Sequence, residues 1–115
     1  MPLTQNHTIR VLIADDHAVV RHGLKQILSK TPDMVVVEEA ETGSEVLKKL
    51  QLVTVDTLVM DIEMPEQSGW DVLLEVRKIH PKLPVIILSI YPENPFGLRF
   101  LKAGASGYLS KTSAP

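Results

Sequence analysis

The sequence predicts an α/β protein built on one doubly wound parallel sheet of five strands, in the order 2-1-3-4-5. Two observations predict this fold class. Short runs of apolar and β-branched residues recur along the chain, as in strands that are buried on both faces. Between these runs, apolar residues recur at helical spacing. Strands separated by amphipathic helices indicate a parallel sheet covered on both faces, with the order that right-handed crossovers favour.

The first half of the chain predicts two strands and two helices. The first strand covers residues 9–14 and ends at two aspartates, and the second covers residues 34–40. Residues 18–29 form the first helix, with Asp16 as its cap and Thr31-Pro32-Asp33 as its stop. The second helix opens at Thr42-Gly43-Ser44. Apolar residues face inward from the two helices: Val19, Val20, Leu24, Ile27 and Leu28 from the first, and Val46, Leu47 and Leu50 from the second.

The second half continues the alternation. The third strand covers residues 56–61, and a helix opens at Ser68 or Gly69 and ends before His80-Pro81. The fourth strand covers residues 84–89. A short helix over residues 95–102, which Gly104 ends, and a fifth strand over residues 107–111 complete the sheet.

The ends of the chain carry their own expectations. Residues 1–8 are polar and predict a flexible arm before one domain over residues 9–115. Right-handed crossovers put only the first helix on one face, so that a fifth helix is needed beside it, yet none is present before Pro115. We expect a piece of a longer chain. If nothing follows, bare apolar sheet surface predicts low stability or pairing with a second subunit.

Composition excludes several classes of protein. The chain has 115 residues, of which 44% are hydrophobic and 23% charged, and its net charge is −2, which gives no general attraction to nucleic acid or membranes. It has no cysteine, which excludes disulfides, thiolate catalysis and Cys-ligated zinc. No apolar run approaches the about 20 residues of a membrane span, and the start is no secretory signal. We therefore expect a cytoplasmic protein with no membrane contact.

Three aspartates are predicted to meet at one edge of the sheet. Asp15 and Asp16 follow the first strand and Asp61 ends the third, and these strands are neighbours at the switch point where such sheets bind ligands. A pair of carboxylates at about 4 Å repels by about 4 kcal/mol at an effective dielectric of 20. A cation must offset this repulsion, and a set of oxygen ligands suits Mg²⁺.

Two further side chains are expected at the same edge. Ser89 ends the fourth strand and Lys111 ends the fifth. A hydroxyl and an ammonium group beside a carboxylate-bound Mg²⁺ suit a phosphoryl group, and carboxylates themselves can accept phosphoryl groups. His17 and His22 near the start of the first helix suggest a metal-binding or phosphorelay histidine. No carboxylate follows them at metal-binding spacing, so they are interpreted as surface or capping residues.

At these positions the chain resembles the receiver domain of bacterial two-component response regulators, which has a flavodoxin-like strand order. Its first and last matching segments resemble the NarL/FixJ subfamily, in which a LuxR-type helix-turn-helix domain follows the receiver. The resemblance covers nearly the whole chain and rests on these segments: Val11-Leu12-Ile13-Ala14-Asp15-Asp16-His17, Met60-Asp61-Ile62-Glu63-Met64-Pro65 with Ser68-Gly69, Leu88-Ser89, and Lys102-Ala103-Gly104-Ala105-Ser106-Gly107-Tyr108-Leu109-Ser110-Lys111.

The resemblance implies how the phosphoryl group is received. Asp61 is the phosphoacceptor, and its donor is a phosphohistidine on a sensor histidine kinase. Asp16 binds Mg²⁺ directly, Asp15 helps through water, and the backbone carbonyl of Glu63 is a further ligand beside Asp61. In-line transfer is then mainly positioning and charge neutralisation.

The resemblance also implies the response. Lys111 pairs with the phosphoryl oxygens, Ser89 moves to hydrogen-bond one of them, and Tyr108 changes its rotamer with that movement. The implied protein is a switch in phosphorelay signalling rather than a turnover enzyme. It would regulate transcription through a C-terminal DNA-binding domain that is absent from this chain, and it would have no other cofactor. Formation of a homodimer is left open.

Three alternatives stay open at this point. A Mg²⁺-dependent phosphatase with Asp61 as nucleophile would carry a second aspartate two residues on, where this chain has Glu63. A flavodoxin-like FMN module would want a phosphate loop rich in small residues after the first strand, where Asp15-Asp16 would repel phosphate. A receiver-like interaction module that is never phosphorylated is the third alternative.

Overall fold

The computed structural model describes residues 8–89, 99 and 101–110, with no account of the side chains of Leu109 and Ser110. These residues form one sheet of five strands in the order β2-β1-β3-β4-β5, and every neighbouring pair is parallel. The predicted fold class and strand order are confirmed. The strands are β1 (Ile9–Ala14), β2 (Met34–Ala40), β3 (Thr57–Asp61), β4 (Val85–Ser89) and β5 (Gly107–Ser110).

The three complete helices begin near the predicted residues. They are α1 (Ala18–Ser29), α2 (Gly43–Leu52) and α3 (Gly69–Ile79). The Thr42 side chain caps α2 by accepting a hydrogen bond from the Glu45 N–H, and Ser68 caps α3 in the same way from the Asp71 N–H. The expected cap of α1 was wrong. His17, not Asp16, occupies that position, and its side chain makes no capping bond to described residues.

The short helix before β5 is described only at its end. Arg99, Leu101 and Lys102 are helical, and the Gly104 N–H donates to the Leu101 carbonyl at 3.1 Å. Gly104 ends the helix as predicted, since its φ of 113° is a conformation that side chains disfavour. The rest of the predicted helix, residues 1–7 of the predicted arm over residues 1–8, and Lys111 lie outside the described residues.

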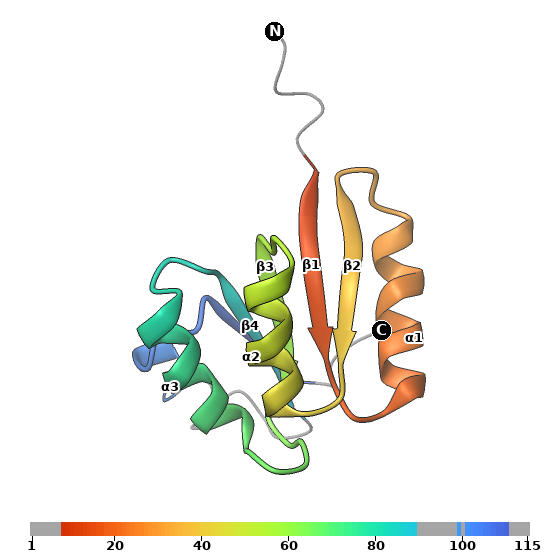
Figure 1. Ribbon diagram of the computed structural model, residues 1–115. Helices are drawn as coiled ribbons and strands as arrows, with labels where there is room; N and C mark the ends of the chain where they lie inside the picture. The colour runs from red at the N-terminus through yellow and green to blue at the C-terminus, as the bar shows by residue number, and fades with distance from the viewer. Residues whose placement is uncertain (1–7, 90–98, 100, 111–115) are drawn as a thin grey trace, which may run out of the picture.

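One face of the sheet carries the main core. Figure 1 shows α2 and α3 together on the near side of the sheet, with α1 apart from them past β2. Apolar side chains from alternate strand positions pack there against the two helices, and none is more than 8% exposed. They include Leu12, Leu58, Met60, Val85 and Ile87 from the strands and Val46, Leu50, Val72, Leu73 and Val76 from the helices.

The opposite face is covered less completely. No residue of α1 is buried, and Val19 and Ile27, which were expected to face inward, are 84% and 56% exposed. Val59 and Ile86 on the central strands are only half-buried, while their chain neighbours Met60 and Ile87 are fully buried. The predicted apolar stripe of α1 therefore exists but is not covered by the residues that the structure describes.

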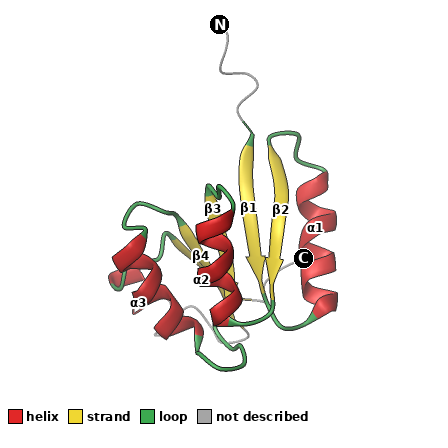
Figure 2. Ribbon diagram, in the orientation of Figure 1, coloured by secondary structure: helices red, strands yellow, loops and turns green. Residues whose placement is uncertain are grey.

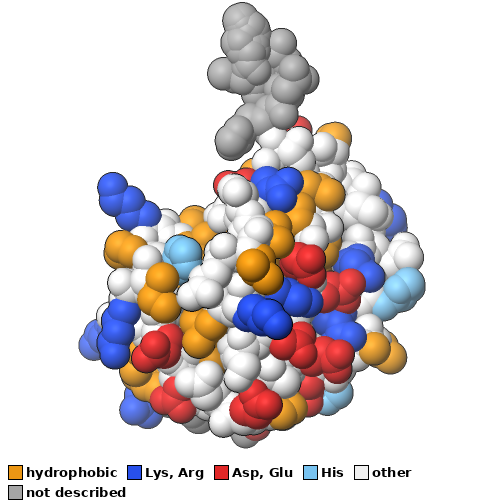
Figure 3. Space-filling model, in the orientation of Figure 1, with side chains coloured by type: hydrophobic (Ala, Val, Ile, Leu, Met, Phe, Trp, Pro, Cys, Tyr) orange, Lys and Arg blue, Asp and Glu red, His pale blue; other side chains and the backbone are white. Residues whose placement is uncertain are grey.

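A shift in strand register decides which face of the sheet each of two adjacent glutamates occupies. Val11 pairs with Val36, but Leu12 pairs with Glu38, so Val37 is an extra residue in β2. Glu38 therefore lies on the same face as Leu12, and its Oε1 atom is 3.1 Å from Lys49 Nζ of α2. Glu39 lies on the other face with Ile13 and forms ion pairs with Arg21 and Lys25 of α1. Acidic and basic side chains accordingly gather side by side over α1, β2 and α2 in Figure 3.

None of the helices described by the structure is both long and apolar enough to cross a lipid bilayer. Figure 2 shows the loops that leave the carboxyl ends of β1 and β3 on the same side of the molecule. Those loops carry the residues that were predicted to form a site.

Candidate functional site

The three predicted aspartates lie together at the carboxyl ends of two neighbouring strands. Ala14 of β1 pairs with Met60 of β3, and Asp15 and Asp61 are the next residues along the chain, at the carboxyl ends of the two strands. Asp15 is fully buried and Asp61 is 3% exposed, whereas the Asp16 side chain is 32% exposed. The parallel pairing of strands far apart in the sequence therefore brings these carboxylates to one place.

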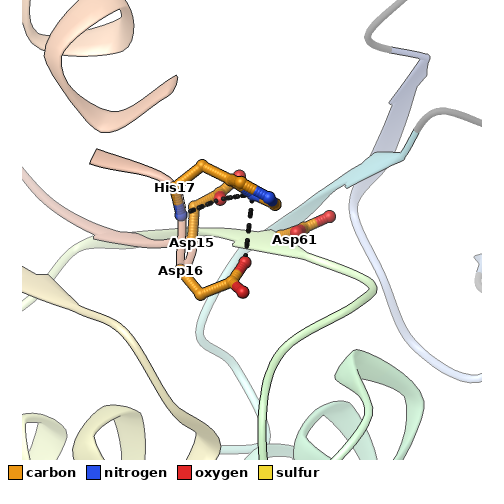
Figure 4. Close-up of side chains that lie close together, drawn as sticks. All are labelled: Asp15, Asp16, His17 and Asp61. Atoms are coloured by element: carbon orange, nitrogen blue, oxygen red, sulfur yellow. Dashed lines mark hydrogen bonds and ion pairs between the residues drawn. The ribbon is translucent and has the colours of Figure 1, made fainter. Parts of the chain in front are cut away.

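A histidine joins the carboxylates. Asp15, Asp16, His17 and Asp61 each offer one ligand atom, and these four atoms all lie within 4.8 Å of one another. Figure 4 shows the His17 side chain turned back toward the carboxylates of Asp15 and Asp16, with Asp61 beside them on the neighbouring strand. The His17 Nδ1 atom lies 3.0 Å from Asp15 Oδ1 and 3.1 Å from Asp16 Oδ1.

One oxygen of this cluster is suited to a cation. Asp16 Oδ1 is buried and accepts no hydrogen bond from the part of the chain that the structure describes, although His17 Nδ1 is close to it. A buried carboxylate oxygen without a donor is costly. A divalent cation would satisfy it and would also offset the repulsion among the carboxylates. The ligand atoms are carboxylate oxygens and one imidazole nitrogen, so the donor set fits a hard or borderline cation.

The backbone that carries Asp15 is fixed from three directions. Its N–H donates to the Ala40 carbonyl at 3.0 Å, and its side chain accepts a hydrogen bond from the His17 N–H at 2.8 Å. Its carbonyl accepts a hydrogen bond from Arg21 Nη1 at 2.6 Å. Arg21 is itself held by Glu39, since its Nε lies 2.9 Å from Glu39 Oε1. The position of Asp15 therefore depends on β2 and α1 as well as on β1.

Lys25 and Arg21 also set the charge state of Glu39. Lys25 Nζ lies 2.8 Å from Glu39 Oε2. The hydrogen bond from Lys25 and that from Arg21 hold the pKa of Glu39 below its ordinary value, against the opposing effect of partial burial. Glu39 therefore stays ionised and keeps Arg21 in place beside Asp15.

The loop after Asp61 is shaped by close backbone approach. The Gly69 N–H donates to the Ile62 carbonyl at 2.6 Å. Glu66 has a φ of 76°, a conformation that a residue with a side chain adopts only at a cost, and its carboxylate accepts a hydrogen bond from Ser44 Oγ at 2.8 Å. This hydrogen bond ties the loop to the start of α2. Hydrogen bonds therefore fix the loop between β3 and α3 to the first turn of α2 and to the first residue of α3.

The remaining predicted site residues are placed as follows. Ser89 is the last residue of β4, is fully buried and pairs in register with Ser110. It stands one residue beyond Leu88, the register partner of Asp61, so its strand ends at the same edge. Tyr108 is 6% exposed and belongs to the core cluster beside β4. Glu63 is exposed, two residues after Asp61. Lys111 lies outside the described residues.

The interpretation of His17 from the sequence was incomplete. It is a capping-position residue and 64% of its side chain is exposed, as expected of a surface residue. However, its ring also reaches Asp15 and Asp16. The signal available in the sequence was the run of three adjacent polar residues directly after a buried strand, which places all three side chains at the strand end.

A model of the family described as the response regulator receiver domain matches residues 11–115 of the chain. Among sequences, the response regulator GacA of Pseudomonas viridiflava is 38% identical over 103 residues, which are 90% of this chain and 48% of GacA. The chain thus spans about half the length of this relative.

Solved structures show the same similarity. A LuxR-family two-component response regulator from Aurantimonas sp. SI85-9A1 superimposes with a TM-score of 0.88 at 31% identity, covering 94% of this chain and 77% of that one. RcsB of Salmonella enterica serovar Typhimurium, in a structure bound to the promoter rprA with phosphomimetic BeF₃⁻, gives a TM-score of 0.86 at 25% identity, covering 94% and 62%. The resemblance predicted from the sequence is confirmed.

Proposed function

The chain belongs to the response regulator receiver domain family, and on that basis we propose that it is a signalling switch that accepts a phosphoryl group on Asp61. The observation that carries this proposal is the burial of Asp61 at the carboxyl end of β3, beside Asp15 and Asp16. The Asp16 Oδ1 atom there accepts no hydrogen bond from the described residues. Ionised carboxylates gathered in a buried place repel one another, and a bound cation would offset that cost.

Asp15, Asp16 and Asp61 would hold Mg²⁺, together with the backbone carbonyl of Glu63. The ion would neutralise negative charge on the oxygens of the phosphoryl group during transfer. Asp16 is the best direct ligand because its Oδ1 atom is buried and accepts no hydrogen bond from the described residues. Asp15 Oδ1 accepts a hydrogen bond from the His17 N–H, which positions the third carboxylate of the site.

The chemical step is an in-line displacement at phosphorus. A carboxylate oxygen of Asp61 forms the new P–O bond, and the P–N bond of a phosphohistidine on the kinase breaks, with the electron pair staying on the departing imidazole. A carboxylate nucleophile has no proton to lose, so this step would need no general base. The product is an acyl phosphate on β3 that gains negative charge relative to the carboxylate.

The response to phosphorylation would run through β4 and β5. Ser89 stands at the end of β4, the strand paired with β3, and its hydroxyl would move to donate a hydrogen bond to a phosphoryl oxygen. Tyr108 lies in the paired strand β5, in register with Ile87, and would change rotamer with that movement. Lys111, which follows β5, would pair with the phosphoryl oxygens.

The output of the whole protein is a further part of the proposal. The matched relative GacA is about twice as long as the matched region, and RcsB is seen bound to a promoter. We place this domain before a DNA-binding domain in a cytoplasmic transcription regulator, where a sensor histidine kinase is its phosphoryl donor. Phosphorylation would then change the domain's surface and so the activity of its DNA-binding partner.

Treatment with acetyl phosphate tests the proposal without the kinase. The intact mass of the chain is measured after incubation with acetyl phosphate and Mg²⁺, and again with a chelator in place of Mg²⁺. The expected result is one added phosphoryl group that appears only with Mg²⁺ and is lost in acid or base. No adduct on a folded chain that binds Mg²⁺ would contradict phosphoryl acceptance, and sustained release of phosphate from unrelated esters would favour a phosphatase instead.

A further inference from the structure

We propose that His17 is a nitrogen ligand of the metal site, and that it gives this site a preference for first-row transition cations such as Mn²⁺ and Ni²⁺ over Mg²⁺. The inference rests on the proposed metal site and adds a ligand to it. It assigns a role to a side chain that the proposed phosphoryl transfer does not use.

The distances around the His17 ring match the spacing of ligands around one ion. Ligand atoms about 2.1 Å from an octahedral ion stand about 3.0 Å apart when they are adjacent. His17 Nδ1 lies 3.0 Å from Asp15 Oδ1 and 3.1 Å from Asp16 Oδ1. All four ligand atoms lie within 4.8 Å of one another, so small side-chain rotations would bring them onto one ion.

The backbone of His17 is fixed, whereas its imidazole ring can rotate. The backbone N–H of His17 donates a hydrogen bond to Asp15 Oδ1 at 2.8 Å, which holds the main chain beside the carboxylates. Its side chain is 64% exposed and does not have to displace packed neighbours to rotate. The imidazole therefore closes the solvent side of a site whose inner walls, Asp15 and Asp61, are buried.

Hydrogen bonding alone leaves this arrangement incomplete. An imidazole Nδ1 carries at most one hydrogen, which can serve Asp15 or Asp16 but not both in good geometry. Asp16 Oδ1 accordingly has no hydrogen-bond donor among the described residues. Metal coordination would satisfy both Asp15 and Asp16, because the two carboxylates and the lone pair of His17 Nδ1 can face one cation while the ring proton resides on Nε2.

The change in ligand set has a predictable effect on selectivity. Mg²⁺ is a hard ion that prefers oxygen ligands and keeps much of its water. An imidazole instead suits transition cations, whose affinity for a given site rises from Mn²⁺ to Ni²⁺. His17 should therefore strengthen the binding of Mn²⁺ and Ni²⁺ and leave that of Mg²⁺ nearly unchanged.

The test compares metal binding by the full chain with that of His17→Ala. Affinities for Mg²⁺, Mn²⁺ and Ni²⁺ are measured by titration calorimetry, and pulsed electron paramagnetic resonance of the Mn²⁺-loaded chain detects a coordinated nitrogen directly. His22→Ala is the matched control, because His22 is an exposed histidine of α1 that contacts Gln26. A variant Asp16→Asn reports whether binding occurs at the acidic cluster.

The expected result is a loss of at least about tenfold in Mn²⁺ and Ni²⁺ affinity in His17→Ala, the lower end of what even indirect partners of a metal contribute. The nitrogen signal should disappear in His17→Ala and persist in His22→Ala. Three results would overturn the inference: equal transition-metal affinities, absence of the nitrogen signal in the parent chain, or a rise in the affinity for all three ions, which would make His17 a competitor of the metal.

The same data separate failure of this inference from failure of the proposed function. If Mg²⁺ binds in an Asp16-dependent way while His17→Ala changes nothing, the role of His17 alone is refuted. If no ion binds at the acidic cluster, both the metal site and the ligand role of His17 are refuted.

Discussion

A Cβ atom on Gly69 would lie 2.7 Å from the carbonyl oxygen of Asp61 and 2.7 Å from the Cα of Ile62. The first turn of α3 therefore rests directly on the backbone that presents the proposed phosphoacceptor. No side chain fits between them. This contact makes the start of α3 a support for Asp61, and it links the stability of the fold to the geometry of the site.

Replacement of Gly69 by alanine should destabilise the chain by about 1–3 kcal/mol, the usual cost of overpacking. The atoms in the way are backbone, which cannot rotate aside. Chemical denaturation measures the effect. Gly23→Ala in α1 is the control, because no heavy atom lies within 4 Å of a Cβ there and alanine favours a helix by about 1 kcal/mol. Equal stabilities of the two variants would refute the close contact.

Arg21→Ala should weaken metal binding although Arg21 touches no metal ligand atom. It removes the hydrogen bond that Arg21 Nη1 donates to the Asp15 carbonyl, and loss of such support typically costs about tenfold or more in affinity. Lys25→Ala is the matched control, since Lys25 pairs with the same Glu39 but is not bonded to Asp15. Titration calorimetry with Mg²⁺ gives the comparison. Identical losses in both variants would assign the effect to Glu39 rather than to Asp15.

Glu39 should contribute to stability in a pH-dependent way. Hydrogen bonds from Lys25 and then Arg21 lower the pKa of this carboxyl in the folded chain, so the folded state binds fewer protons there than the unfolded state. Its stabilisation is therefore present above the ordinary pKa of a glutamate and is lost as the pH falls through the lowered value. At a partly exposed site it amounts to at most about 1 kcal/mol.

The measurement for Glu39 is the free energy of unfolding of the parent chain and of Glu39→Gln at several pH values. The two proteins should differ at neutral pH and converge in acid. A difference that stays constant from neutral to acidic pH would show that ionisation of Glu39 is not the source of its effect.

Asp16→Asn should have opposite effects on stability without and with Mg²⁺. Without the ion, the variant relieves repulsion among Asp15, Asp16 and Asp61 and should be more stable than the parent chain. With Mg²⁺, only the parent chain should gain stability, by the free energy of binding. Thermal unfolding with and without Mg²⁺ tests this, with the exposed Asp33→Asn as control. Equal Mg²⁺ stabilisation of parent and Asp16→Asn would place the ion elsewhere.

Much of the fold could be predicted because its signals are local and periodic. The strands at residues 9–14 and 34–40 and the helix at 18–29 have the predicted bounds. The third and fourth strands each begin one residue later than predicted, at Thr57 and Val85. Such ends depend on pairing with a neighbour, which the sequence of one strand does not encode.

The parts that could not be predicted depend on contacts between distant segments. The extra residue at Val37 decides which face of the sheet Glu38 and Glu39 each occupy, and only the pairing with β1 reveals it. The bond from Arg21 to the Asp15 carbonyl requires both the helix position and the strand register. The three aspartates were predictable because parallel strands deliver their ends to one edge, whereas the contact of His17 with them depends on a side-chain rotamer.

The central claim is that Asp61, and no other carboxylate, accepts the phosphoryl group. The most direct measurement is the intact mass of Asp61→Asn and Asp56→Asn after incubation with acetyl phosphate and Mg²⁺. Asp56 is the matched control, because it precedes the same strand at the opposite edge and accepts a hydrogen bond from the Arg10 N–H. The parent chain and Asp56→Asn should each gain one phosphoryl group, and Asp61→Asn should gain none. An adduct of equal yield on folded Asp61→Asn would contradict the claim.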